Sequence, residues 1–115
     1  MQPDAIAPPS LPVSEVALFL DLDGAIVPIA PEPDAVSASP PCRIVLRRAL
    51  DHLRGRLAVV SGRTIDAVDR ILGGAVHSVA GVHGLQRRSP AAGLQFEPPH
   101  ARVAEATSVL RRLAG

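Results

Sequence analysis

The chain has 115 residues, 47% of them hydrophobic, so it can bury one modest core and is not disordered throughout. A net charge of +1, with two phenylalanines as the only aromatic residues, excludes a charge-driven or base-stacking nucleic-acid binder and gives no case for binding anionic membranes. Cys42 is the single cysteine, which excludes an internal disulfide and a cysteine zinc site.

Residues 1–13, "MQPDAIAPPSLPV", are predicted to form a flexible, proline-rich tail. The stretch has neither the basic start of a signal peptide nor an apolar run long enough to span a membrane. We therefore expect a cytoplasmic protein that does not enter a membrane. Residues 14–115 are predicted to form one partial domain without an internal boundary.

The first half of that domain is predicted to form, in order, a strand, a helix, a strand and a helix. Residues 16–20 are a continuous apolar run, which is typical of a parallel strand covered on both faces. A loop rich in proline and alanine leads to an amphipathic helix over residues 42–55. Residues 56–60 form the next strand. The helix after it is capped by Ser61 or Thr64 and ends at Gly73.

The second half continues with a third strand near residues 76–80 and a hairpin formed by residues 85–88 and 94–97. Arg87 and Arg88 are expected on a solvated face of that hairpin. A last helix over residues 100–113 should turn its apolar side chains inward. Strands that alternate with helices predict an α/β protein with a parallel sheet and flanking helices.

Polar side chains follow each of the three predicted strands. Asp21 and Asp23 end the first strand, Ser61 to Arg63 follow the second, and His83 follows the third. The carboxyl ends of parallel strands share one edge of a sheet, where α/β proteins bind their ligands. Backbone amides at the start of the next helix should add an anion site there.

The spacing of Asp21 and Asp23 is itself informative. Two carboxylates on the same side of an extended chain repel each other unless a cation lies between them or one holds a proton. Both solutions suit phosphoryl transfer with magnesium. There are structural alternatives for each of these residues. The Asp-x-Asp-Gly pattern of residues 21–24 also occurs in ordinary turns. Arg63 could form a surface ion pair, and His83 could be an ordinary loop histidine.

Three segments resemble a known family. The stretch "LFLDLDGAIVPI" resembles the first motif of the haloacid dehalogenase-like (HAD) superfamily. Together with "LAVVSGRTIDAVDRILG" and "VAGVHGLQRR", it resembles the N-terminal portion of the trehalose-6-phosphate phosphatase family. The resemblance implies part of a three-layer, Rossmann-like HAD core. It also implies Mg²⁺-dependent hydrolysis of trehalose 6-phosphate, a small sugar phosphate, to trehalose through an aspartyl-phosphate.

The resemblance also implies roles for individual residues. Asp21 would be the nucleophile and a magnesium ligand, and Asp23 would be the general acid and base, with its backbone carbonyl on Mg²⁺. The phosphate and the sugar would be bound by a second set of residues, namely Ser61, Gly62, Arg63, His83 and Gly84.

The sequence departs from the family pattern in ways that bear on activity. Ala25 stands where threonine or valine is usual, and the chain has no lysine to neutralise the nucleophile and the phosphate. We expect this chain to lack the cap domain and the later strands of the family. We therefore expect an incomplete phosphatase, which is a fragment, a truncated gene product, or one piece that a second chain completes. The alternatives are a non-catalytic HAD module that binds a partner chain, and another HAD sugar-phosphate phosphatase.

Overall fold

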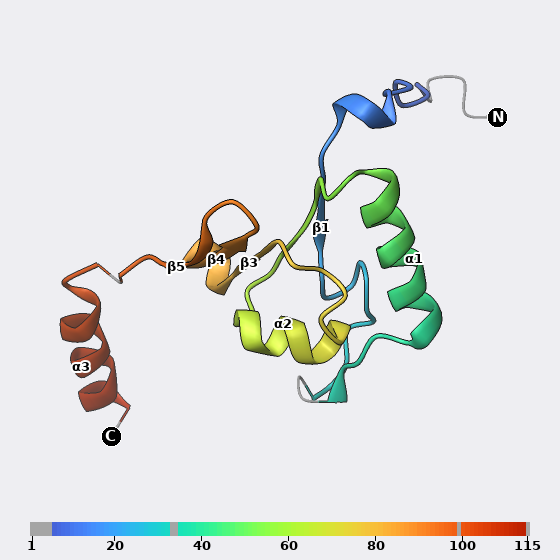
Figure 1. The fold of residues 1–115 in the computed structure, drawn as a ribbon. Coiled ribbons are helices and arrows are strands. Elements are labelled where there is room, and N and C mark those ends of the chain that lie inside the picture. The colour runs from blue at the N-terminus through green and yellow to red at the C-terminus, as the bar shows by residue number, and fades with distance from the viewer. Residues whose placement is uncertain (1–5, 33–34, 99, 115) are drawn as a thin grey trace.

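The computed structural model describes residues 6–32, 35–98 and 100–114. It has an α/β fold, in which strands and helices alternate before a final hairpin and helix (Figure 1). The helices are η1 (Val13–Glu15), α1 (Pro40–His52), α2 (Ile65–Leu72), η3 (Val82–Gly84) and α3 (Val103–Leu113). The strands are β1 (Leu18–Asp21), β2 (Leu57–Val60), β3 (Val79–Gly81), β4 (Gln86–Ser89) and β5 (Gly93–Phe96).

The five strands form one mixed sheet in the order β1-β2-β3-β4-β5. Strands β1, β2 and β3 are parallel, as predicted, and their register places Asp21 opposite Val60. The β4–β5 hairpin adds two antiparallel strands, with Gly81 opposite Gln86. The α/β class is therefore confirmed, and the ends of β1, β2 and β3 meet at one edge.

Local sequence signals fix the ends of α1 and α2. Helix α1 begins at Pro40, two residues before the predicted start, because Ser39 accepts a hydrogen bond from the Cys42 amide at 3.3 Å. Thr64 caps α2 by accepting from the Ala67 amide at 3.1 Å, which decides between the two predicted caps. The helix ends at Gly73 in a left-handed conformation with φ 63°.

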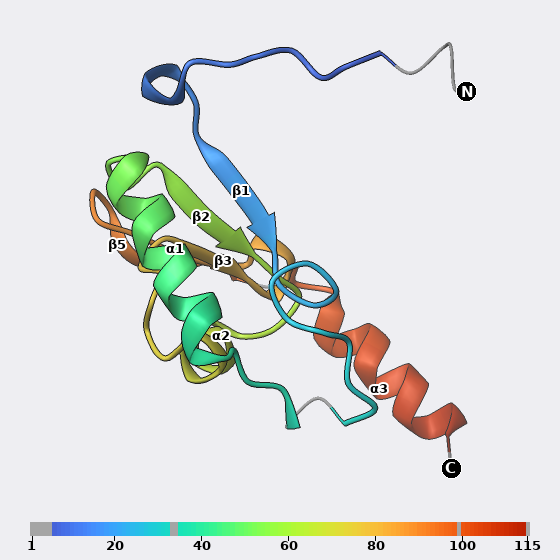
Figure 2. The ribbon, with the colours of Figure 1, turned by 90° about the vertical axis from the view of Figure 1, so that its right-hand side faces the viewer.

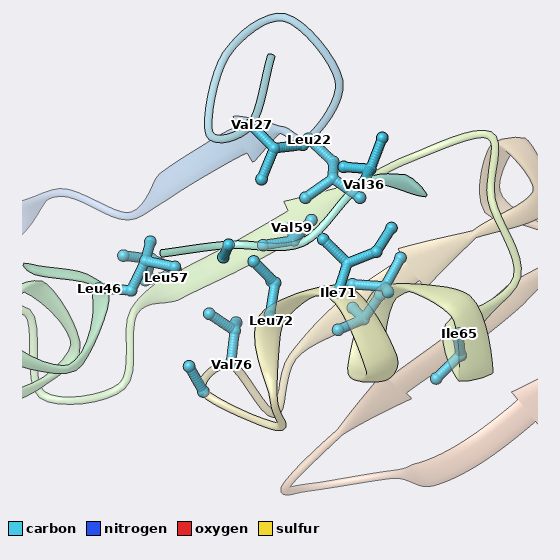
Figure 3. Close-up of a cluster of buried hydrophobic side chains, with 14 of the residues drawn as sticks. Leu22, Val27, Val36, Leu46, Leu57, Val59, Ile65, Ile71, Leu72 and Val76 are labelled. Atoms are coloured by element: carbon cyan, nitrogen blue, oxygen red, sulfur yellow. The ribbon is translucent and has the colours of Figure 1, made fainter. Parts of the chain in front are cut away.

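The core lies between one face of the sheet and helices α1 and α2, which both lie on the same side of it (Figure 2). Alternate strand residues, such as Leu57, Val59 and Val79, point into this core. Helix α2 contributes the buried residues Ile65, Val68, Ile71 and Leu72 to this core. Ile65, Ile71 and Leu72 are labelled in Figure 3.

The opposite face of the sheet is open. We define the open sheet face as the groove of about 360 Å³ on this side. Its lining includes Ala17, Phe19, Ala58, Val60 and Ala80 together with the arginines Arg56, Arg87 and Arg88. The prediction that residues 16–20 are covered on both faces is therefore wrong, since the side chain of Phe19 is 70% exposed. The physical reason is that no helix covers this face and no strand lies beyond β1 in the described residues.

Helix α3 also differs from its prediction. It begins at Val103, and it lies apart from the sheet (Figure 1). None of its residues is buried, so its apolar side chains do not turn inward as expected. The helix forms without the tertiary packing that usually stabilises an amphipathic face.

In the described part of the N-terminal segment, side-chain hydrogen bonds to the rest of the protein are found only near residues 13–16. Residues 1–5 of the predicted tail lie outside the described residues, and residues 6–12 are exposed. Arg56 donates to the carbonyl of Val13 at 2.7 Å and to that of Val16 at 2.9 Å. Helices long and apolar enough to cross a membrane are absent from the described ranges.

Arg88 joins β4 to α2 rather than facing solvent. Its guanidinium forms two hydrogen bonds of 2.7 Å with the Asp69 carboxylate and donates to the His77 carbonyl at 2.8 Å. The bonds to Asp69 raise the pKa of Arg88. Arg87 is exposed as predicted and pairs with Glu97 at 3.1 Å. The expectation of a solvated face therefore holds for Arg87 and is wrong for Arg88.

The substitution Arg88→Ala should lower the free energy of unfolding by roughly 1.5–3 kcal/mol, the range for hydrogen bonds to charged groups. Arg87→Ala is the matched control, because its exposed ion pair should contribute at most about 1 kcal/mol. Urea denaturation of both variants measures the difference. Equal losses in the two variants would contradict a special role for Arg88.

Candidate active site

The carboxyl ends of β1 and β2 and the loop after β3 form one pocket of about 370 Å³. Its polar lining comes from Asp21, Ser61, Gly62 and His83, and its apolar lining comes from Phe19, Leu20 and Val60. The structure therefore brings together these four predicted site residues, which come from three segments. Asp23 and Arg63 form an ion pair with each other, and Gly84 ends η3 directly after His83.

Asp21 is exposed at the end of β1, while the next residue is fully buried. Leu22 has no exposed surface, and its amide donates to Oδ1 of Asp21 at 2.8 Å. The chain then turns through Gly24, whose φ is 80° and whose amide donates to the Val27 carbonyl at 2.7 Å. The buried side chain of Leu22, directly after Asp21, thus fixes the position of the Asp21 carboxylate at the pocket.

Asp23 is held by the guanidinium of Arg63. The two side chains form a bidentate pair, with Nε to Oδ2 at 2.9 Å and Nη2 to Oδ1 at 2.8 Å. The hydrogen bonds from Arg63 lower the pKa of Asp23, against a smaller opposing effect of burial. In this arrangement Asp23 is a carboxylate at neutral pH, so it can accept a proton, but it must leave Arg63 before it can donate one.

Removal of this ion pair should be visible in a titration. Arg63→Ala should raise the pKa of Asp23 towards its ordinary value of about 3.9, followed by NMR of the Asp23 carboxyl carbon. Because the pair lowers the pKa in the folded state, its stabilisation is present above that ordinary value and is lost as the pH falls through the lowered one. Arg87→Ala should leave the Asp23 titration unchanged, and an unshifted pKa in Arg63→Ala would contradict the role of the pair.

Backbone hydrogen bonds fasten the loop after β3 to the loop after β2. The Val82 amide donates to the Arg63 carbonyl at 2.8 Å, and the His83 amide donates to the Ser61 carbonyl at 3.2 Å. Gly81 allows this approach, because a Cβ atom there would lie 2.7 Å from the Arg63 carbonyl oxygen. The two loops therefore hold the serine and the histidine in a fixed relation.

Ser61 and Gly62 fit this arrangement closely. Ser61 is buried, and its hydroxyl accepts from the Arg63 amide at 3.1 Å, so the hydroxyl proton can be donated to an oxygen in the pocket. A Cβ atom on Gly62 would lie 2.8 Å from Cε1 of His83. The imidazole thus packs directly over the backbone of Gly62.

The conformation of Val82 and His83 is a feature that the sequence pattern did not predict. Both residues have left-handed backbone angles, with φ of 49° and 53°. Such angles are strained for a β-branched residue, and strained residues of this kind cluster at functional sites. The flanking glycines, Gly81 and Gly84, were the only sequence signal of an unusual turn.

The predicted anion site at the start of α2 is largely occupied by the protein itself. The Ile65 amide donates to Oε1 of Gln86 at 3.0 Å, and the Ala67 amide donates to the hydroxyl of Thr64. The expectation that the first amides of this helix bind a ligand is therefore wrong for these two. The reason is that the side chains of Gln86 and Thr64 already accept hydrogen bonds from these amides.

Comparison with known proteins gives the family context of this pocket. A probable trehalose-phosphate phosphatase of Sinorhizobium fredii is 44% identical over 78 residues, which is 64% of this chain and 28% of that protein. Trehalose 6-phosphate phosphatase RA3 of Zea mays is 37% identical over 95 residues, or 83% of this chain and 25% of that protein. The chain is similar to part of a trehalose-phosphate phosphatase.

The trehalose-6-phosphate phosphatase of Escherichia coli is likewise 35% identical over 75 residues, which is 65% of this chain and 28% of that protein. No protein-family model matches. The resemblance predicted from the sequence motifs is thus confirmed. The chain spans between 25% and 28% of the length of these three trehalose-phosphate phosphatases.

The described residues of this phosphatase-like chain do not form a complete magnesium site. Within the described ranges, no group of three His, Cys, Asp or Glu residues is placed to hold a metal ion. Asp21 is the acidic residue on the pocket, whereas both carboxylate oxygens of Asp23 bond to Arg63. One carboxylate is the smaller of the usual numbers, since Mg²⁺ is commonly held by one or two carboxylates together with substrate phosphate and water.

Proposed function

We propose that this chain carries the nucleophile and phosphate-binding half of a phosphatase site that acts on trehalose 6-phosphate. The observation that supports the proposal is the convergence of Asp21, Ser61 and His83 on one pocket, in a chain similar to trehalose-phosphate phosphatases. The substrate is taken from the names of those relatives.

The proposed reaction has two steps. An oxygen of Asp21 attacks phosphorus, the bond from phosphorus to the sugar oxygen breaks, and that oxygen leaves with a proton. Water then attacks phosphorus and releases phosphate from the aspartyl-phosphate. After it separates from Arg63, Asp23 would take up a proton from solvent, give it to the leaving sugar oxygen, and then accept a proton from the attacking water. Ser61 would donate to a phosphate oxygen.

Mg²⁺ remains the proposed cofactor, held by the Asp21 carboxylate and the Asp23 backbone carbonyl. When bound, it would offset the negative charge that phosphate brings beside Asp21. The described residues leave that ion short of ligands, so we assign no step to it. We expect phosphate release by this chain to require Mg²⁺ at concentrations that reflect weak binding.

The test measures phosphate release by the purified chain from trehalose 6-phosphate, with Mg²⁺ and with excess chelator. Glucose 6-phosphate serves as the control substrate, because it presents the same ester with one sugar fewer. Faster release from trehalose 6-phosphate that stops with chelator supports the proposal. No release from either ester at high protein concentration would refute independent activity, and equal rates would favour another sugar-phosphate phosphatase.

A second candidate function is a non-catalytic module that binds another polypeptide. The observation that favours it is the position of β1, whose outer edge no strand of the described residues pairs. Such an edge offers unpaired backbone groups to a partner strand. We propose a second chain as that partner, and absence of turnover combined with specific capture of a second chain would distinguish this module from the enzyme.

A further inference from the structure

The loop between β2 and α2 is attached to β3 and β4 at its two ends. We call residues 61–64 the β2–α2 loop. At its start, the Ser61 amide donates to the Ala80 carbonyl at 2.8 Å, and directly after it the Ile65 amide donates to Oε1 of Gln86 at 3.0 Å. The first bond joins backbone atoms, so it does not depend on the residue type. The second depends on one side chain, so the identity of residue 86 can change the position of the loop.

We propose that Gln86 is a positioning residue for the candidate active site, because its side chain keeps the β2–α2 loop where the Ser61 hydroxyl can reach phosphate. This inference rests on the proposed function, in which Ser61 donates to a phosphate oxygen. Gln86 does not line the pocket that contains Asp21 and Ser61, so it acts on that pocket through the loop. It extends the site to β4, a strand whose four residues are all absent from the pocket lining.

The Ile65 amide depends on Gln86 because of its place in the helix. Ile65 is the first residue of α2, and the first amides of a helix have no carbonyl partner within that helix. Since Ile65 is only 4% exposed, an amide left there without an acceptor would cost free energy, which a shift of the loop towards water would relieve. Gln86 approaches from a fixed position, because it pairs with Gly81 across β3 and β4.

A shift at Ile65 would reach the phosphate-binding serine through Arg63. The Arg63 amide donates to the Ser61 hydroxyl at 3.1 Å, and the Arg63 guanidinium forms the ion pair with Asp23. Arg63 lies only two residues before Ile65, so movement of the helix start displaces the amide that orients the serine hydroxyl. A displacement of about 1 Å in a reacting or binding group can cost about a hundredfold in rate.

The test compares Gln86→Met with Gln86→Glu. Methionine has a similar length but offers the Ile65 amide no oxygen, whereas glutamate keeps an acceptor and places its charge at the favourable end of α2. The probe is inorganic phosphate, and its affinity is measured by NMR from the shift of the Ser61 amide. Gln86→Met should bind phosphate at least about tenfold more weakly than the wild type, and Gln86→Glu should restore the binding.

Gln95→Met is the matched control, because Gln95 is an exposed residue of β5 outside the pocket lining, and its phosphate affinity should equal that of the wild type. Circular dichroism sets a temperature at which every variant is folded. A purely structural role would lower the stability of Gln86→Met without changing the phosphate affinity of its folded state. Should Gln86→Met fail to fold, Gln86→Ala removes the same acceptor and carries the same expectation.

The outcomes separate this inference from the proposed function. Wild-type phosphate affinity in Gln86→Met, or an equal loss in Gln86→Glu, would overturn the role of Gln86 and leave the proposed function standing. A wild type whose Ser61 amide does not respond to phosphate would overturn the proposed function, and the inference with it.

Discussion

Asp21→Asn is expected to reduce phosphate release from trehalose 6-phosphate by roughly a thousandfold or more, as removal of a nucleophile does in other hydrolases. The amide that replaces the carboxylate has no anionic oxygen to attack phosphorus. Its carbonyl oxygen can still accept from the Leu22 amide, which bonds Oδ1 at 2.8 Å in the wild type. The loop should therefore keep its shape while the chemistry is lost.

Asp51→Asn provides the matched control for this prediction. Asp51 is an exposed acid on α1, outside the candidate pocket, and its replacement makes the same change of charge. Calorimetric titration with trehalose 6-phosphate should show that Asp21→Asn still binds the ester. If Asp21→Asn kept the wild-type rate, the nucleophile would have to be another group.

Gly81→Val, at the last residue of β3, should be the most damaging single change around the pocket, with a loss of about 3 kcal/mol or more in the free energy of unfolding. A Cβ atom at this position would lie 2.7 Å from the Arg63 carbonyl oxygen and 3.0 Å from the Ile65 amide nitrogen. Both contacts are with backbone, so no side chain can move aside. The loop after β3 would have to separate from the loop after β2.

Ala80→Val is the matched control, because Ala80 is the neighbouring residue of β3 and lies on the open sheet face. It adds the same valine where space is available, so its stability should stay within about 0.5 kcal/mol of the wild type. Urea denaturation of both variants measures the contrast. Similar midpoints would show that the close approach at Gly81 is not needed for stability.

Local sequence patterns predicted the parts of the fold that local forces determine. The run of residues 56–60 contains β2, and the segment with helically spaced apolar residues that ends at Gly73 contains α2. Both could be predicted because strand burial and helix caps depend on neighbours in the chain. The shared edge for Asp21, Ser61 and His83 also followed from the order of the strands. The alternation of strands and helices is therefore sufficient to place these three residues together.

Features that depend on distant segments could not be predicted in the same way. The pairing of Asp23 with Arg63 joins residues 40 positions apart, and residue types alone do not specify it. The left-handed angle of Val82 runs against the preference of a β-branched residue, and the Val82 amide in this conformation bonds to the carbonyl of Arg63, 19 positions earlier. Likewise, the exposure of Phe19 depends on what covers that face of the sheet. A short apolar run carries no information about this cover.

The single layer of helices has a consequence for the energetics of unfolding. A sheet packed on one side exposes less new apolar surface when it unfolds than a sheet packed on both, and that surface sets the heat capacity change and the denaturant dependence. For the isolated chain we expect a heat capacity change of unfolding below the usual value of roughly 12–15 cal/mol/K per residue. We also expect the free energy of unfolding to fall only slowly with urea concentration.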